Sequence, residues 1–184
     1  MIKVTTAPAS EPITLSEVKL WLKIEEGETV EDTLLNSLIT ASRQWVESHC
    51  GISIMPQTIT ESYDCWYRLF CLQRNPVVSV TAIKYTIDEV LTVYSSDDYV
   101  VDLYSTPTRI LITGDAPTVD DVPGAIKIEY VSGYADAATV PGPIKTALLY
   151  KIGSMYVNRA DYAQRYLNFS LGLLKDYKAE FARI

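Results

Sequence analysis

The stretch Thr29–Gly51, TVEDTLLNSLITASRQWVESHCG, carries the longest helical pattern of the chain. Thr29 and Asp32 fit a capping box at its start, and Gly51 fits a left-handed cap at its end. The pattern predicts a central packing helix, about 30 Å long for roughly twenty residues. Its apolar positions recur every three or four residues, the spacing of one buried helix face: Leu34, Leu35, Leu38, Ile39, Ser42 with Trp45, Val46 and Cys50.

The composition is that of a globular protein with a buried core, because 48% of the 184 residues are hydrophobic and 21% are charged. This length predicts one domain, or one domain that carries a substantial insertion. No apolar run reaches the roughly 18 residues that cross a bilayer, and no signal-peptide pattern precedes the first segment. We therefore expect a cytoplasmic setting and no membrane partner.

The charge balance is acidic, with a net charge of −7. Lys and Arg are scattered along the chain, whereas proteins that grip nucleic acid cluster them against the phosphates. The pattern therefore disfavours a DNA-binding protein, although an acidic surface is compatible with DNA that passes without adhering. The three cysteines, Cys50, Cys65 and Cys71, lack the spacing of a disulfide framework or a zinc site.

The sequence pattern over residues 1–51 predicts an N-terminal arm followed by a pair of helices. Residues 1–12 are small and polar and contain two prolines, which is typical of an extended or mobile arm. Thr14 and Glu17 form a second capping box before a helix over about 15–24. The short loop at 25–28 forces this helix to run antiparallel to the next one, so that residues 13–51 form an antiparallel pair.

Residues 52–135 change to the two-residue period of β-strands. Val, Ile, Thr and Tyr predominate there, and turn-forming residues separate short segments, which predicts an antiparallel region. Ile126, Ile128 and Tyr130 share one face of the clearest strand. The expected strands are 58–64, 68–72, 77–87, 90–94, 99–103, 109–113 and 125–131.

Helical periodicity returns over residues 141–160, where Gly142 and Pro143 mark the start of a third helix. The C-terminal segment, residues 161–184, is aromatic and amphipathic, and a short helix is expected near 171–181. The predicted fold is α+β: an antiparallel helical core of three main helices and a short C-terminal helix, with an antiparallel β region inserted between helices two and three. We treat residues 1–184 as a single domain.

The residues that carry chemistry do not form a recognisable catalytic, cofactor or metal motif. The one histidine, His49, adjoins Cys50, but neighbouring helix residues point about 100° apart, which is poor geometry for a dyad. Acidic pairs such as Asp97/Asp98 and Asp120/Asp121 lack the residue order of an EF-hand calcium site. Two carboxylates distant in sequence could still meet in space as a glycosidase-like catalytic pair, but solvent-exposed loop positions are the favoured interpretation. We therefore expect no catalytic residue, no cofactor and no metal, and the protein is predicted not to be an enzyme.

The order of these segments resembles the head–tail connector, or adaptor, proteins of long-tailed double-stranded DNA bacteriophages and related prophages. The resemblance covers most of the chain. It depends on the order and spacing of the motifs, because each motif alone can be explained by helix capping or core packing. Asp88-Glu89 departs from the glycine turn that such proteins often have, and residues 164–170 also diverge. The matching segments are ITLSEVKLWL (13–22), EDTLLNSLITASRQWVE (31–47), Gln57-Thr58, Asn75-Pro76-Val77, IEYVSGY (128–134), Tyr156 with Asn158-Arg159, and LGLLKDYK (171–178).

The resemblance implies a structural protein of the virion neck, made in the host bacterial cytoplasm. Such proteins form a ring of about a dozen copies through one repeated head-to-tail interface. The implied partners are the portal protein, the next neck protein (a stopper or tail-completion protein), other copies of the chain, and DNA that passes through the channel. We predict that the C-terminal segment docks onto the portal through six apolar or aromatic residues: Tyr166, Phe169, Leu173, Leu174, Tyr177 and Phe181.

An alternative function follows from the thirteen tyrosines, which suit protein interfaces and sugar-binding faces as well as a sheet core. A carbohydrate- or receptor-binding β module with helical flanks would use exposed tyrosines and strand loops. For the tyrosines of the C-terminal segment, interface and core are equally favoured. If they complete the core, deleting residues 166–184 lowers the melting temperature; if they dock onto the portal, the deletion leaves a folded protein that no longer joins filled heads.

Overall fold

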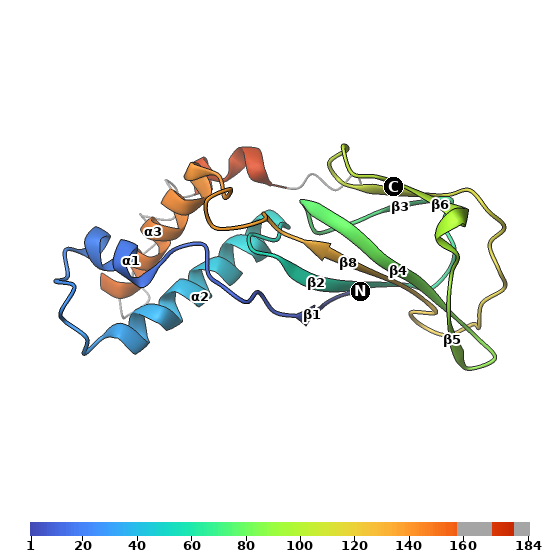
Figure 1. Ribbon diagram of the computed structural model, residues 1–184, viewed down its shortest axis with the longest axis horizontal. Helices are drawn as coiled ribbons and strands as arrows, with labels where there is room; N and C mark the ends of the chain where they lie inside the picture. Colours follow the sequence, from blue (N-terminus) through green and yellow to red (C-terminus); the bar gives the residue numbers. More distant parts are fainter. Residues whose placement is uncertain (158–170, 179–184) are drawn as a thin grey trace. The chain divides into compact units, whose positions relative to one another are not determined.

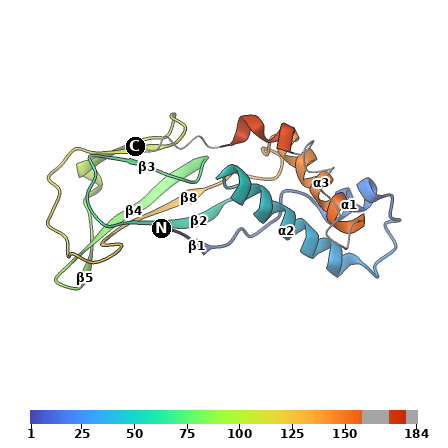
Figure 2. The same cartoon turned by 180° about the vertical axis from the view of Figure 1, so that it is seen from behind.

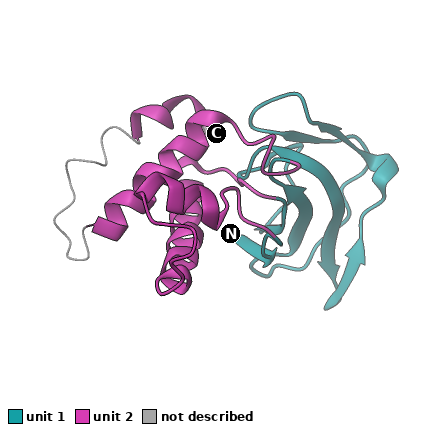
Figure 3. Cartoon of the chain, turned by 60° about the vertical axis from the view of Figure 1, so that its left-hand side comes forward, with its two compact units in different colours: residues 1–9, 56–134, 179–184 teal, residues 10–55, 135–178 magenta. Residues whose placement is uncertain are grey.

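A computed structural model describes residues 1–157 and 171–178 of the chain, and these residues form helices and antiparallel sheets (Figure 1). They fall into two compact units, shown in different colours in Figure 3. The described residues of unit 1 are 1–9 and 56–134, and those of unit 2 are 10–55, 135–157 and 171–178. The α+β class predicted from the sequence is confirmed.

Unit 2 contains the predicted helices, beginning with α1 (Leu15–Leu22). Its capping box is confirmed: the backbone N–H of Glu17 donates to Thr14 Oγ1 at 3.2 Å, and the backbone N–H of Thr14 donates to Glu17 Oε2 at 2.7 Å. The hydrogen bond from the Thr14 backbone holds the pKa of Glu17 below its ordinary value. The helix ends at Lys23, whose φ of 59° is left-handed.

Helix α2 (Asp32–Cys50) begins two residues later than the capping box at Thr29 predicted, and that prediction is wrong. The reason is the buried ammonium of Lys19, which organises the preceding residues as a loop. It donates to the backbone carbonyls of Glu26 at 3.2 Å and Glu28 at 2.7 Å, and it pairs with Asp32 Oδ1 at 2.6 Å. The end of the helix is as predicted, because Gly51 caps it with a φ of 69°.

Helix α3 (Gly142–Val157) packs against both α1 and α2. Figure 2 shows the three helices from behind. Its buried face consists of Ile144, Ala147, Leu148 and Ile152, which recur at the three- and four-residue spacing of one helix face. The predicted end near Arg159 lies outside the described residues. Beyond that gap, a 3₁₀ turn at Lys175–Tyr177 occupies part of the range in which a short C-terminal helix was expected.

Unit 1 contains a five-stranded and a three-stranded antiparallel sheet. The first has the order β1-β2-β8-β4-β5, with β1 at Ile2–Thr6, β2 at Gln57–Tyr63, β8 at Ile126–Ser132, β4 at Val77–Ile87 and β5 at Val90–Val93. The second has the order β3-β7-β6, with β3 at Leu69–Cys71, β7 at Arg109–Ile112 and β6 at Tyr99–Asp102. The predicted strands are therefore all present, with no end shifted by more than one residue.

One hydrophobic core joins the inner faces of both sheets. It contains Ile126, Ile128 and Tyr130, which the alternation of β8 placed on one face. Aromatic rings line the same core, including Tyr63 and Tyr94. Several of the thirteen tyrosines thus pack in unit 1.

The N-terminal arm is extended, and part of it is ordered as strand β1. Ile2 to Val4 pair in register with Glu61 to Ile59 of β2. The terminal ammonium of Met1 also donates to the carbonyl of Ser62 at 2.9 Å. Main-chain hydrogen bonds therefore hold the arm, because most of its side chains are exposed.

Candidate assembly surfaces

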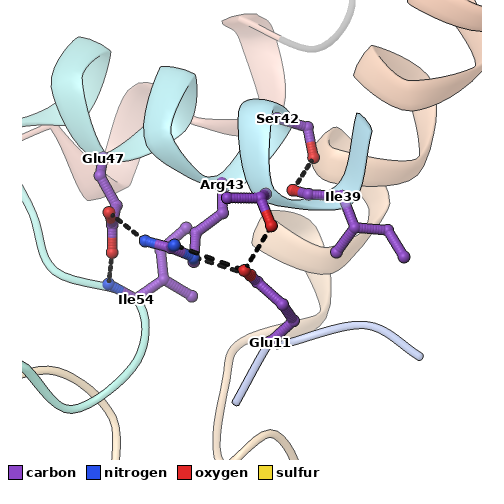
Figure 4. A network of polar contacts seen from close by, with 7 residues as sticks. Glu11, Ile39, Ser42, Arg43, Glu47 and Ile54 are labelled. Atoms are coloured by element: carbon purple, nitrogen blue, oxygen red, sulfur yellow. Dashed lines mark hydrogen bonds and ion pairs between the residues drawn. The ribbon is translucent and has the colours of Figure 1, made fainter. Parts of the chain in front are cut away.

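A buried polar network holds α2 to the chain on either side of it (Figure 4). Arg43 donates from Nε to Glu11 Oε2 at 2.7 Å and from Nη1 to Glu47 Oε2 at 2.8 Å. The other oxygen of Glu47 accepts the backbone N–H of Ile54 at 2.8 Å. Burial opposes the charge of Arg43, but its two carboxylate partners outweigh burial and raise the pKa of the guanidinium. The network therefore anchors α2 to the residues that precede and follow it.

A second buried carboxylate, Glu61 on β2, organises the core of unit 1. It accepts the hydroxyl of Tyr63 at 2.6 Å, the hydroxyl of Tyr130, and the backbone N–H of Gln73 at 2.7 Å. Burial, followed by the charge of Glu61, raises the pKa of both tyrosines, so both remain protonated donors. This cluster ties β2 and β8 to the loop that follows β3.

The catalytic and metal candidates from the sequence do not meet in a site. His49 is exposed and stacks on Trp45 with ring centroids 5.4 Å apart, whereas Cys50 is buried and burial raises the pKa of its thiol. A raised pKa disfavours the thiolate that a Cys–His dyad needs. Among residues 1–157 and 171–178, no group of three or more His, Cys, Asp or Glu side chains is placed to hold a metal ion. In this same part of the chain, no helix combines the length and apolarity that crossing a membrane requires.

One acidic side chain has a structural role that the sequence pattern did not reveal. The turn between β4 and β5 consists of Asp88 and Glu89, with left-handed φ values of 50° and 63°. The carboxylate of Asp120 accepts the backbone N–H of each residue at 3.0 Å. This bidentate acceptor stabilises a turn that ordinarily favours glycine or asparagine. The turn and the acidic loop are distant in sequence, and only the fold brings them together.

The predicted portal-docking residues are partly described. Tyr166, Phe169 and Phe181 lie outside the described residues. Leu174 is buried, whereas Leu173 and Tyr177 are half-buried. Leu174 therefore belongs to the packing of unit 2 in the isolated chain. That this segment contacts a portal stays a prediction.

Each unit carries an apolar surface that the sequence analysis did not identify. In unit 1, Leu69, Val100 and Leu111 line a hollow of about 280 Å³ on the exposed face of the three-stranded sheet, beside the Asp102–Arg109 ion pair. In unit 2, a groove of about 400 Å³ lies between α1 and α3. Exposed apolar area of this kind marks interaction surfaces. Both units thus present exposed apolar area among their described residues.

The fold is similar to that of proteins in gene transfer agent particles. The chain resembles a protein in the neck of an empty gene transfer agent particle determined with C6 symmetry, with a TM-score of 0.85 and 19% identity over 99% of this chain and 97% of that one. It also resembles a protein in the virion of the native particle, with a TM-score of 0.81, 18% identity and the same coverage. A third likeness is to the neck of the native particle with C12 symmetry, with a TM-score of 0.79, 17% identity and again the same coverage.

No curated protein sequence matches the chain. A family model does match it, over residues 12–112, which is more than half of the 184 residues. The match begins just before α1 and ends with β7, so it includes the helix pair and most of the β region. The chain therefore belongs to the family of phage gp6-like head-tail connector proteins.

Proposed function

We propose that this protein is a structural connector in the neck of a tailed bacteriophage or related particle, where it joins the DNA-filled head to the tail. The observation that carries the proposal is the family match over residues 12–112. The shared fold with neck proteins supports it. The described residues also place their buried carboxylates in packing roles, which agrees with a structural, non-enzymatic function.

The connector acts as a ring of about a dozen copies. The neck structures that it resembles were determined with C6 and C12 symmetry, which supports a closed cyclic assembly. A ring of this kind repeats one heterologous interface, in which two different surfaces of the chain meet. We infer that the portal lies on one side and the next neck protein on the other. A net charge of −7 suits a channel that DNA must pass through without binding.

The 184 residues act as one connector domain whose helical core is formed by α1, α2 and α3, with the β region inserted between α2 and α3. Contacts among the three helices support this arrangement. The Arg43 network supports it as well. Through this network, α2 is hydrogen-bonded to Glu11, which precedes the helix, and to Ile54, which follows it.

The C-terminal segment docks onto the portal through Leu173, Tyr177 and the neighbouring aromatic residues. Leu173→Asp and Tyr177→Asp test this, because both side chains are half-buried and charge would oppose an apolar contact. We expect each variant to join portal-bearing heads more weakly at a nearly unchanged melting temperature. Leu174→Ala is the matched control for packing, since Leu174 is buried and its loss lowers the melting temperature.

Negative-stain electron microscopy of the purified protein, alone and mixed with portal, tests the proposed function. We expect rings, or added density on the tail side of the portal. A protein that stays monomeric and leaves the portal unchanged would contradict the proposal.

A further inference from the structure

The groove of unit 2 is an open apolar site with one basic residue at its edge. We call it the α1–α3 groove, and its lining consists of Trp21, Leu22, Lys23, Tyr150, Gly153, Ser154 and Val157. Trp21 is 41% exposed and Val157 is 74% exposed, so two large apolar side chains face outward. The groove offers contact area for aliphatic side chains.

The groove is preformed by close packing of the two helices. The indole of Trp21 packs beside Gly153 of α3, where a Cβ would lie 3.4 Å from Trp21 Nε1, an ordinary contact distance. The ring of Trp21 meets Tyr150 edge-on, with centroids 5.2 Å apart. Lys23 follows at the left-handed end of α1, and its ammonium has no ion-pair partner among the described residues.

The β4–β5 hairpin of unit 1 has the complementary properties. Its turn carries the acidic residues Asp88 and Glu89, whose carboxylates form no ion pair within the described part of the chain. The next two residues are apolar and open to solvent: Val90 is 61% exposed and Leu91 is 47% exposed. Asp120 holds the turn in one conformation through both backbone N–H groups. The hairpin is therefore a preorganised acidic and apolar projection.

The other apolar surface of unit 1 matches the groove less well. On the face formed by Leu69, Val100 and Leu111, the adjacent carboxylate of Asp102 is already paired with Arg109 at 2.8 Å. That face has no unpaired acid beside it to meet Lys23. Charge complementarity thus selects the hairpin.

We propose that the β4–β5 hairpin of one copy docks into the α1–α3 groove of the neighbouring copy. Glu89 and Asp88 face Lys23, and Val90 and Leu91 cover the exposed indole of Trp21. The two surfaces are different and belong to different units, so the contact is heterologous and can propagate head to tail. This inference rests on the proposed ring and specifies which surfaces form it.

Charge reversal at the two sites tests the contact. Lys23→Glu and Glu89→Lys each place like charges together at every interface of the ring, and each should weaken ring formation about tenfold or more. The double variant restores the attraction with reversed sign and should recover most of the ring. Lys3→Glu is the matched control, because Lys3 is exposed on β1, far in sequence from both sites, and should leave the ring intact.

A second pair of variants separates the apolar contribution from folding. Leu91→Ser and Val157→Ser remove exposed apolar area without changing charge, and both should weaken the ring at an unchanged melting temperature. Mass photometry over a concentration series measures the ring fraction, with portal added where wild type needs it for assembly.

The outcomes distinguish this inference from the proposed function. Loss of rings in both single reversals and recovery in the double variant support the contact. If both single-reversal variants form rings as well as the wild type does, the proposed contact is wrong, and the connector function is unaffected. If the variants form intact rings but bind the portal more weakly, the groove binds the portal instead, and the contact between copies is wrong. If Val157→Ser forms intact rings but has a lower melting temperature, the groove residues serve the packing of their own chain, and the contact is again wrong. A wild type that stays monomeric and adds no density to the portal would overturn both proposals.

Discussion

Arg43 and Glu47, one turn apart on α2, form an ion pair of 2.8 Å with both side chains buried, 6% and 8% exposed. The pair lies in the helix that the longest apolar pattern predicted, but both residues are buried although neither was among the apolar positions of that pattern. A buried ion pair is retained only if its remaining hydrogen-bonding groups also find partners. Here Glu11 and the backbone N–H of Ile54 supply them, which makes the pair the anchor of the chain around α2.

Arg43→Met should therefore destabilise the protein strongly. The substitution keeps apolar contacts but removes the positive charge beside the buried carboxylate of Glu47, and breaking such a pair costs about 3–5 kcal/mol. Urea unfolding followed by circular dichroism measures the loss, with Gln44→Met on the exposed face of α2 as the control. Equal stability of the two variants would show that the network adds little.

Tyr130→Phe should destabilise unit 1. The variant removes one of the donors to the buried Glu61 while preserving the ring, and loss of a hydrogen bond to a buried charge costs about 1.5–3 kcal/mol. Tyr104→Phe is the control, since Tyr104 is fully exposed. The prediction fails if thermal unfolding gives the same midpoint for both variants.

Asp120→Ala should loosen the β4–β5 turn. Two backbone N–H groups lose their acceptor, and the left-handed residues Asp88 and Glu89 lose the contact that stabilises them, at a cost of about 1–2 kcal/mol. Glu89→Gly in the same background should recover part of the stability, because glycine adopts positive φ without strain. Hydrogen exchange at residues 86–92 checks both effects, and unchanged protection in Asp120→Ala would contradict the role of the carboxylate.

Asp102 should make stability depend on pH in the acidic range. Hydrogen bonds from Ser105 and then Arg109 lower the pKa of Asp102 to about 2, from an ordinary value of 3.8. Because the folded-state pKa is the lower one, the stabilisation is present above about pH 4 and is lost as the pH falls toward 2. The stability difference between wild type and Asp102→Asn should therefore shrink over this window. A difference that does not change with pH would exclude this contribution.

The regular elements could be predicted from local signals, and the exceptions have long-range causes. Thr14 with Glu17, Gly51 and the alternation of Ile126 to Tyr130 are each decided by residues close in sequence. The start of α2 could not be predicted in this way, because Lys19 reaches across the loop to Asp32. Strand β1 likewise depends on β2, which is more than fifty residues away.

The assembly surfaces were harder to predict than the fold. The acidic pair at Asp88-Glu89 was visible in the sequence, but its turn geometry depends on Asp120, which a period-two pattern does not reveal. The groove beside Trp21 forms only where α1 and α3 pack together, which the pattern of each helix alone does not reveal. The resemblance to head–tail connectors was confirmed because it depended on the order of many elements rather than on one site.

The most direct test of the account is to remove the protein from the particle that it serves. Particles assembled without this chain should accumulate as DNA-filled heads and separate tails when examined by electron microscopy, and supplying the chain should restore joined particles. Joined, tailed particles in its absence would contradict its role as the connector between head and tail.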